Sequence, residues 1–386
     1  MIYLPTMSLL PNPDQQRIGL ILTGGGARAA YQIGVLRAIA TILPKPARNP
    51  FHVIAGTSAG ALNAASLATH AHHLRTAVRI LENIWKNISS DMIYDLHSAN
   101  LLAGASGLVL NMLSGKNSDN AVALLNNAPL ADLLARVIKF DRIQHNIDIG
   151  LLDALSITAS AYGSGESVSF YQGIKNIENW QGPHRIGVRT ELGLKHLMAS
   201  AAIPVIFPAV KLGAQYFGDG AIRQLAPTST ALHLGARRLL VIGVSGNRIK
   251  ASVKEEMREQ PSLSQILGHI LNSAFVDTLE NDLEFLRHMN AVIPFVPESA
   301  IERNAIHMNK IDLLEISPSR ELNVLAMEHY HELPKGMTRY IKEGSSGTLL
   351  SLILFERGFC SALWQLGFDD AMEVEGRIRD FFSDQY

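Results

Sequence analysis

The stretch Val53-Ile54-Ala55-Gly56-Thr57-Ser58-Ala59-Gly60-Ala61 places a Gly-x-Ser-x-Gly pentapeptide between a β-branched run and a series of small residues. This order predicts a strand, a sharp turn and a helix, with Ser58 at the tip as in a nucleophile elbow. Gly56 and Gly60 would let the backbone close up around the turn. The start of the helix would favour the negative charge that a carbonyl oxygen acquires when Ser58 attacks the carbonyl carbon. An ordinary strand-to-helix turn is the alternative, because the pentapeptide is common by chance.

The chain before this stretch has the same alternation of strand and helix. Residues 17–23 form an apolar run of strand length that Gly24, Gly25 and Gly26 end, and residues 27–43 repeat apolar side chains at helical spacing until Pro44. Residues 51–55 supply the second strand. The first third therefore reads β-α-β-α, which is typical of an α/β fold whose parallel sheet is covered by helices on both faces.

The glycine triplet has two interpretations. With Ala29 it matches a dinucleotide-binding fingerprint formally, but that fingerprint needs an acidic residue about twenty positions later. No Asp or Glu occurs between Asp14 and Glu82, so we disfavour a nucleotide. Backbone N–H groups converging at a helix start also form an anion nest or an oxyanion hole. Because the triplet and Ser58 both follow strands, we expect them at one carboxyl edge of the sheet.

Further along the chain the pattern predicts more helices and strands. Residues 154–162 and 167–172 alternate around a Gly-Ser-Gly turn and predict a β-hairpin. The region 91–118 is either a buried helical insert or a lid that touches acyl chains, and residues 250–260 form an exposed connection. We also predict helices over 72–88, 127–140, 190–200, 227–234 and 262–289, strands over 238–244, 291–296 and 311–316, and only helices after Pro318.

Composition limits the class of protein. The 386 residues are 47% hydrophobic and 18% charged with a net charge of -1, which predicts a globular chain with no global attraction to nucleic acid or membrane. The arginines and Lys45 between Asp14 and Glu82 form either a solvated basic face, which we favour, or a phosphate-attracting rim. Cys360 is the only cysteine, so an internal disulfide and a cysteine-built metal cluster are excluded. We expect neither a signal peptide nor a transmembrane helix, and a protein of the cytoplasm or of the membrane surface.

A serine nucleophile needs a base. His52, His196 and His233 lie within helix or strand patterns, and we interpret each as a core or surface histidine. Asp219 differs from them, because it lies between Gly218 and Gly220 after an apolar aromatic pair, where a carboxylate needs partners. Taken alone, a turn-capping role would be the simpler interpretation of Asp219.

Three motifs in order resemble the patatin-like phospholipase family. These are Gly-Gly-Gly-x-Arg at 24–28, Gly-x-Ser-x-Gly at 56–60 and Asp-Gly-Ala at 219–221, and the segment Ser-Ala-Ala-Ile-Pro at 200–204 is similar as well. The resemblance extends from about residue 17 to about residue 244, and the helical tail resembles extensions of bacterial members. Ala29 stands where the family usually has glycine.

The resemblance implies a three-layer α/β/α patatin-like fold with a mostly parallel central sheet and a helical C-terminal extension. It divides the chain into a catalytic domain over 15–300 and an extension over 301–386 that packs on it. It also implies a Ser58/Asp219 dyad without histidine, with Gly24, Gly25 and Gly26 as oxyanion donors. Arg28 would hold the glycine loop or add positive charge near the phosphate or the oxyanion.

The activity that the resemblance implies is hydrolysis of fatty-acyl esters in phospholipids or lysophospholipids, through an acyl-serine and with no metal or cofactor. The partners would be an acyl-ester lipid and, transiently, a membrane surface, with no nucleic acid. Two alternatives stay open: an acyltransferase on the same scaffold, and a non-catalytic lipid-binding module.

Overall fold

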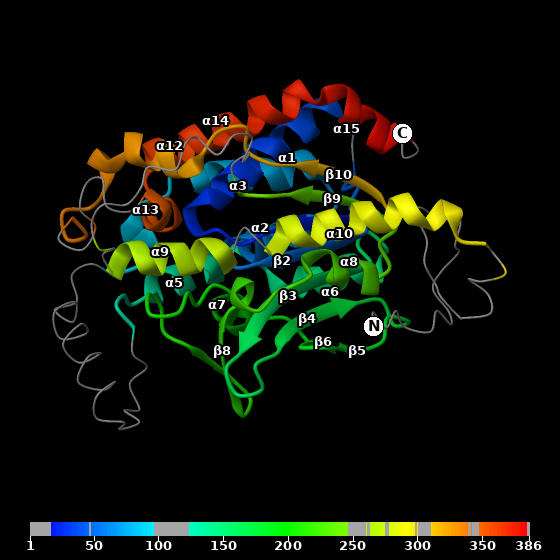
Figure 1. The fold of residues 1–386 in the computed structure, drawn as a ribbon, viewed down its shortest axis with the longest axis horizontal. Helices are drawn as coiled ribbons and strands as arrows, with labels where there is room; N and C mark the ends of the chain where they lie inside the picture. Colours follow the sequence, from blue (N-terminus) through cyan, green and yellow to red (C-terminus); the bar gives the residue numbers. More distant parts are fainter. Residues whose placement is uncertain are drawn as a thin grey trace.

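The computed structural model describes residues 17–45, 48–95, 123–245, 260, 263–274, 278–297, 299, 310–338, 341 and 347–383. Within them the chain forms an α/β structure around one mixed sheet of ten strands (Figure 1). The strands are β1 (Ile18–Leu22), β2 (Val53–Thr57), β3 (Ala154–Ala161), β4 (Ser167–Gly173), β5 (Trp180–Gly182), β6 (Arg185–Arg189), β7 (Val210–Leu212), β8 (Gln215–Asp219), β9 (Arg238–Ile242) and β10 (Asp312–Ile316).

The helical elements named here are α-helices and short 3₁₀ turns. The 3₁₀ turns are η1 (Gly26–Ala29), η2 (Ser90–Met92), η3 (Gly220–Ile222), η5 (Ile293–Phe295) and η6 (Tyr330–Glu332). The α-helices are α1 (Ala30–Ile42), α2 (Ala59–Thr69), α3 (Leu74–Lys86), α5 (Ala128–Val137), α6 (Phe140–Asp148), α7 (Leu194–Ser200), α8 (Pro227–His233), α9 (Leu263–Asn272), α10 (Thr278–Val292), α12 (Leu322–Glu328), α13 (Gly347–Ile353), α14 (Arg357–Glu373) and α15 (Glu375–Phe382).

The parallel part of the sheet is the order β10-β9-β1-β2-β3. Beyond it β4 pairs antiparallel with β3, β6 pairs parallel with β4, and β5 pairs antiparallel with β6. The predicted strand-helix-strand-helix start is confirmed, and so is the predicted hairpin of β3 and β4. Both β1 and β2 are buried along their whole length, because helices cover both faces of a parallel sheet.

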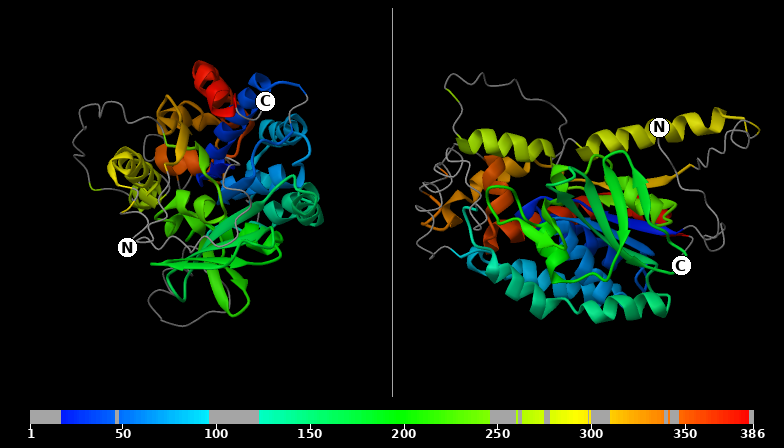
Figure 2. Two further views of the ribbon diagram at one scale, coloured as in Figure 1. Left: turned by 90° about the vertical axis from the view of Figure 1, so that its right-hand side faces the viewer. Right: turned by 90° about the horizontal axis from the view of Figure 1, so that it is seen from below.

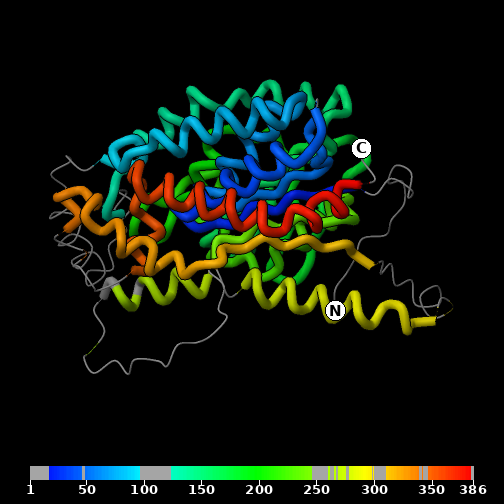
Figure 3. Tube along the Cα trace, turned by 90° about the horizontal axis from the view of Figure 1, so that it is seen from above, coloured from blue at the N-terminus to red at the C-terminus, as the bar shows by residue number. Residues whose placement is uncertain are grey.

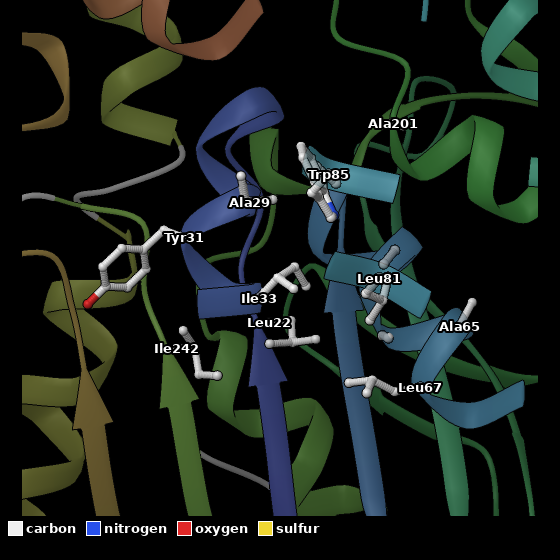
Figure 4. Close-up of a cluster of buried hydrophobic side chains, with 14 of the residues drawn as sticks. Leu22, Ala29, Tyr31, Ile33, Ala65, Leu67, Leu81, Trp85, Ala201 and Ile242 are labelled. Atoms are coloured by element: carbon white, nitrogen blue, oxygen red, sulfur yellow. The ribbon is translucent and has the colours of Figure 1, made fainter. Parts of the chain in front are cut away.

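Alternate side chains of β1 enter two hydrophobic cores. Leu20 and Leu22 belong to the larger core, with side chains of α1, α2 and α3, and Figure 4 shows part of it. Ile21 points to the other face and packs with side chains of α8 and α10. Seen from below, α5 and α6 lie along one side of the molecule and α9 and α10 along the opposite side (Figure 2). The three-layer α/β/α architecture is therefore confirmed.

The C-terminal part of the chain packs closely on the rest. Helix α14 runs along the length of the molecule and packs against α1 (Figure 3). The two backbones meet at glycines: a Cβ on Gly34 would lie 1.9 Å from the Trp364 carbonyl oxygen, and one on Gly367 would lie 2.1 Å from the Tyr31 carbonyl oxygen. Strand β10 pairs with β9, so the segment predicted as an extension also contributes a strand to the main sheet.

Several predictions of secondary structure need correction. The strand predicted over 291–296 is wrong, because α10 continues to Val292 and η5 follows it. The single helix predicted over 262–289 is two helices in the structure, α9 and α10. The helix predicted from residue 190 begins only at Leu194, since Thr190 N–H and Leu192 N–H donate to β4 instead. Strands β5, β6 and β7 and helix α6 were not predicted.

Two predicted segments fall largely outside the described residues. These are the insert or lid over 91–118, of which the structure describes 91–95, and the exposed connection over 250–260, of which it describes 260. Among the described residues no single helix has both the length and the apolar character to cross a membrane. Only α13 and α14 together meet that criterion, as a pair bent by 94°.

Candidate active site

Ser58 lies on the corner between β2 and α2 in a strained conformation. Its φ and ψ are 54° and -129°, and left-handed backbone in a non-glycine residue costs about 1 to 3 kcal/mol. Two hydrogen bonds hold the corner: Ser58 N–H donates to Ser200 Oγ at 2.9 Å, and Ser200 Oγ donates to the Thr158 carbonyl at 2.6 Å. The strand, the sharp turn and the helix predicted around Ser58 are present.

Gly60 allows this corner to sit against β1. A Cβ at Gly60 would lie 2.2 Å from the Leu22 carbonyl oxygen and 2.5 Å from the Thr23 carbonyl oxygen. Because both neighbours are backbone atoms, no larger residue fits unless the end of β1 moves. The second glycine of the motif is thus required by the close packing of α2 on the strand that leads to the glycine triplet.

Asp219 lies next to Ser58 because β8 pairs with β3 directly after the point where the pairing of β2 with β3 ends. Strand β2 pairs with β3 as far as Thr57 opposite Thr158, and β8 then pairs with β3 from Asp219 opposite Ala159. The Ser58 hydroxyl donates to Asp219 Oδ2 at 2.5 Å, and Asp219 Oδ1 accepts from Ala221 N–H at 2.9 Å. The capping role considered for Asp219 is therefore real, and the same carboxylate also bonds the serine.

Burial sets the electrostatics of this pair. Asp219 is 0% exposed and Ser58 is 2% exposed. Burial raises the pKa of the Asp219 carboxyl to about 7, although the hydrogen bonds from Ser58 and Ala221 pull the pKa in the opposite direction. A carboxyl group with a pKa near neutrality can accept and return a proton, as general acid–base catalysis needs.

The glycine triplet lies at the end of β1, beside the same pocket as Ser58. Gly24, Gly25 and Gly26 are all buried, and Gly26 lines the pocket together with Ser58. Gly26 has a φ of +55°, and a Cβ there would lie 2.0 Å from the Leu352 carbonyl oxygen. Gly26 is therefore packed against α13, and its backbone conformation favours glycine.

The Arg28 guanidinium binds the C-terminal part of the chain. It donates to Asn323 Oδ1 at 2.7 Å, Ser351 Oγ at 2.9 Å and Asn272 Oδ1 at 3.5 Å. Burial lowers the pKa of Arg28 to about 10, and the charge of Glu321 partly offsets that effect. Of the two roles expected for Arg28, these contacts favour holding the glycine loop.

The pocket beside Ser58 is apolar and is lined mostly by aliphatic and aromatic side chains. Side chains of α2, α3 and α5 form most of its wall, with Ala201, Ile203 and Phe207 after α7 and Phe355 before α14. The aliphatic and aromatic side chains along its length are Leu62, Leu81, Ile84, Trp85, Ile88, Ile93, Leu130, Leu133, Leu134, Val137 and Ile138. Such a wall suits a hydrocarbon chain that begins at the serine.

The three histidines considered as bases have other partners. His52 Nδ1 accepts from Ile18 N–H, His196 Nδ1 accepts from Gly193 N–H, and His233 Nδ1 lies 2.7 Å from the Ser229 carbonyl. Burial lowers the pKa of His52 and of His196. Among the described residues, no group of three or more His, Cys, Asp and Glu side chains is arranged to hold a metal ion.

Sequence reasoning missed the residues that support the elbow. Ser200 stood in the Ser-Ala-Ala-Ile-Pro segment, but nothing in the motif says that its hydroxyl holds Ser58 N–H. Gln224 gave no signal at all, and its Oε1 accepts from the Thr57 hydroxyl at 2.6 Å. Both contacts join residues far apart in the chain, so only the fold could identify them.

The geometry agrees with a comparison of the sequence with known families. The sequence model of the patatin-like phospholipases matches residues 20–232, which is more than half of the 386 residues. The chain belongs to this family. Membership supports lipid acyl hydrolase activity and implies a lipid substrate. The patatin-like region thus ends before Asn272, Asn323 and Ser351, which bind its Arg28 side chain.

Comparison with solved structures found distant similarity. VipD from Legionella pneumophila is 11% identical, with a TM-score of 0.35 and coverage of 94% of this chain and 67% of that one. The human group IVD cytosolic phospholipase A2, in complex with methyl gamma-linolenyl fluorophosphonate, is 13% identical, with a TM-score of 0.41 and coverage of 95% and 58%. This patatin-like chain thus spans about two thirds or less of their lengths. No curated protein matches it.

Proposed function

We propose that this chain hydrolyses fatty-acyl esters of phospholipids or lysophospholipids, as a phospholipase A or lysophospholipase. The observation that carries the proposal is the 2.5 Å hydrogen bond from Ser58 Oγ to Asp219 Oδ2, made beside an apolar pocket. A hydroxyl bonded to a buried carboxylate with a pKa near 7 has its proton acceptor already in place.

The first half of the reaction forms an acyl-serine. Asp219 takes the Ser58 proton while Ser58 Oγ bonds to the ester carbonyl carbon, and the carbonyl oxygen becomes an oxyanion. N–H groups of Gly24, Gly25 and Gly26 stabilise that oxyanion, and one such donor is worth about 2.7 to 4 kcal/mol. The tetrahedral intermediate then breaks its bond to the alcohol oxygen, and Asp219 returns the proton to the departing lysolipid or glycerol compound.

The second half repeats these steps with water. Asp219 takes a proton from a water molecule, whose oxygen bonds to the acyl carbon, and the proton returns to Ser58 Oγ as the fatty acid leaves. The reaction is balanced by the ester and one water, with no other reagent. Arg28 acts by keeping the glycine loop on the C-terminal helices, and the hydrocarbon chain occupies the pocket lined by α2, α3 and α5.

A lipid substrate requires access to a surface, so we propose transient contact with a membrane. We also propose that residues 15–300 form the catalytic domain and 301–386 an extension packed on it, although β10 joins the two within one sheet.

The test is product analysis with a mixture of phospholipids. The purified chain should release free fatty acid and lysophospholipid, identified by mass spectrometry, and Ser58→Ala should release neither. Ser156→Ala serves as a matched control and should release both products, because it removes a buried hydroxyl from β3 that contacts neither Ser58 nor the pocket beside it. Unchanged release by Ser58→Ala would refute the assigned nucleophile. Acyl transfer to added glycerol in excess of hydrolysis would favour an acyltransferase, and binding without turnover a lipid-binding module.

A further inference from the structure

A second pocket lies on the other side of the sheet from the pocket beside Ser58, which we call the acyl pocket. It is lined by β4, by the turn into β6 and by residues 223–230 around the start of α8. The two pockets share no lining residue. The acyl pocket belongs to the α2 and α3 face of the sheet, whereas α8 covers the opposite face. The proposed hydrolysis makes no use of this second pocket.

The charge around the second pocket is positive. Arg185 and Arg223 both line it, with His184 beside them, and no carboxylate is among its described lining residues. The Arg185 Nε is buried and has no hydrogen-bond partner within the described part of the chain. An unpartnered buried N–H of a guanidinium is unfavourable, so a ligand that accepts a hydrogen bond would relieve it.

One acidic side chain acts on Arg185 from outside the pocket. Asp282 on α10 feels the charge of Arg185, but burial raises the pKa of Asp282. Its Oδ2 accepts from Thr228 N–H at 2.8 Å and from the Thr228 hydroxyl at 2.7 Å. The carboxylate is thus engaged by α8 and makes no hydrogen bond to Arg185. The two positive charges of Arg185 and Arg223 together exceed the single negative charge of Asp282.

The remaining wall of the pocket consists of hydroxyl-bearing residues and a tryptophan ring. Ser167, Ser169 and Thr230 line the pocket, and the hydroxyl groups of Ser169 and Thr230 are bonded to each other at 3.0 Å. The Trp180 ring forms an apolar part of the wall. It is stacked on Tyr171 and His233, with ring centroids 5.2 and 5.0 Å away, so its orientation is fixed.

We propose that this pocket binds a phosphate group, either as a free phosphorylated small molecule or as a lipid headgroup. Guanidinium groups match phosphate oxygens with two parallel hydrogen bonds, and a phosphate has enough oxygens to accept from Arg185, Arg223 and a hydroxyl together. A carboxylate has only two oxygens and would leave part of this donor set unused.

The pocket is linked to the nucleophile elbow by one side chain. Gln224 lines the pocket, its Oε1 accepts from the Thr57 hydroxyl at 2.6 Å, and its Nε2 donates to Thr158 Oγ1 at 3.3 Å. Thr57 directly precedes Ser58, and Thr158 also receives the Ser200 hydrogen bond on its carbonyl. A phosphate that accepts a hydrogen bond from Gln224 would alter the Gln224 hydrogen bonds to Thr57 and Thr158, which support the backbone next to Ser58. We therefore expect phosphate binding in this pocket to change the rate of ester hydrolysis.

The test compares wild type with the Arg185→Gln/Arg223→Gln double variant. Inorganic phosphate is titrated at constant ionic strength while the melting temperature is recorded. In wild type we expect a saturable rise. The double variant should bind phosphate at least tenfold more weakly. Arg136→Gln/Arg142→Gln, which removes the same charge from exposed positions on α5 and α6, should behave as wild type. No saturable rise in wild type, or an equal response in the double variant, overturns the proposal.

Vesicles distinguish the two sources of the phosphate. Binding to phosphatidylcholine vesicles with and without phosphatidic acid is measured by sedimentation. A headgroup ligand predicts that phosphatidic acid increases binding and that the double variant loses the increase. A free ligand predicts the same vesicle binding for both proteins. Phosphate-dependent ester hydrolysis is then followed in wild type, where an unchanged rate at saturation would overturn the link through Gln224. The melting measurement needs no catalysis, so it stands even if the proposed hydrolysis fails.

Discussion

Replacing Asp219 by Asn should abolish turnover and stabilise the protein at the same time. The amide keeps the shape of the side chain and can still accept from Ala221 N–H, but it cannot accept the Ser58 proton. A positioned general base contributes about 10² to 10⁴ in rate, so we expect kcat to fall by at least that factor. The Ser58 hydroxyl stays in place, and substrate binding in the pocket should change little.

The gain in stability follows from the burial of the carboxylate. Its pKa rises from 3.8 to about 7 on folding, which corresponds to about 4 kcal/mol at a pH above both values. Because the folded state holds the proton more tightly than the unfolded state, the free energy of unfolding of wild type falls as the pH rises from about 4 to about 7. This penalty is fully present above pH 7 and absent below pH 4. Asp219→Asn has no such penalty, because the amide does not ionise.

Urea unfolding of wild type and Asp219→Asn at pH 5 and pH 8 measures this effect, because the other titrating groups are common to both proteins. The free-energy difference between the two should grow by about 3 kcal/mol in favour of the variant, since part of the total penalty is already present at pH 5. Asp219→Ala, which loses the hydrogen bond to Ala221, should gain less. A difference that is independent of pH, or retained turnover in Asp219→Asn, would refute the reasoning.

Three further outcomes test the same site. The kcat/KM of wild type on a neutral ester should rise with pH and level off above about 7 as Asp219 loses its proton, and a flat profile from pH 5 to 8 would contradict this assignment. Gly26→Ala should lower kcat by 100-fold or more, because its Cβ would meet the Leu352 carbonyl at 2.0 Å, and initial rates equal to wild type would contradict the packing of the loop. Asn323→Ala removes an acceptor 2.7 Å from the buried Arg28 and should lower the free energy of unfolding by about 1.5 to 3 kcal/mol in urea. Asn323→Asp keeps an acceptor for Arg28 and should not lower the free energy of unfolding. Equal losses of stability in the two variants would argue against this contact.

The sequence by itself identified the parts of the site that depend on local backbone geometry. The Gly-x-Ser-x-Gly stretch and the glycine triplet follow buried strands, and a strand that must turn sharply into a helix admits few residue types. The elbow and the β-α-β-α start were therefore predictable from neighbouring residues. Asp219 was selected by the order of three motifs rather than by local chemistry, since its setting alone favoured a turn cap.

The tertiary structure decided which distant groups meet. Asp219 reaches Ser58 because β8 takes over the pairing of β3 where β2 ends, and that register cannot be read from either strand alone. The same holds for Arg28, whose partners lie about 240 to 320 residues away in the chain. Burial was also decided by the fold, and it is burial that raises the pKa of Asp219. Local sequence fixes backbone shape, whereas pairing and desolvation depend on all the elements that pack around a residue.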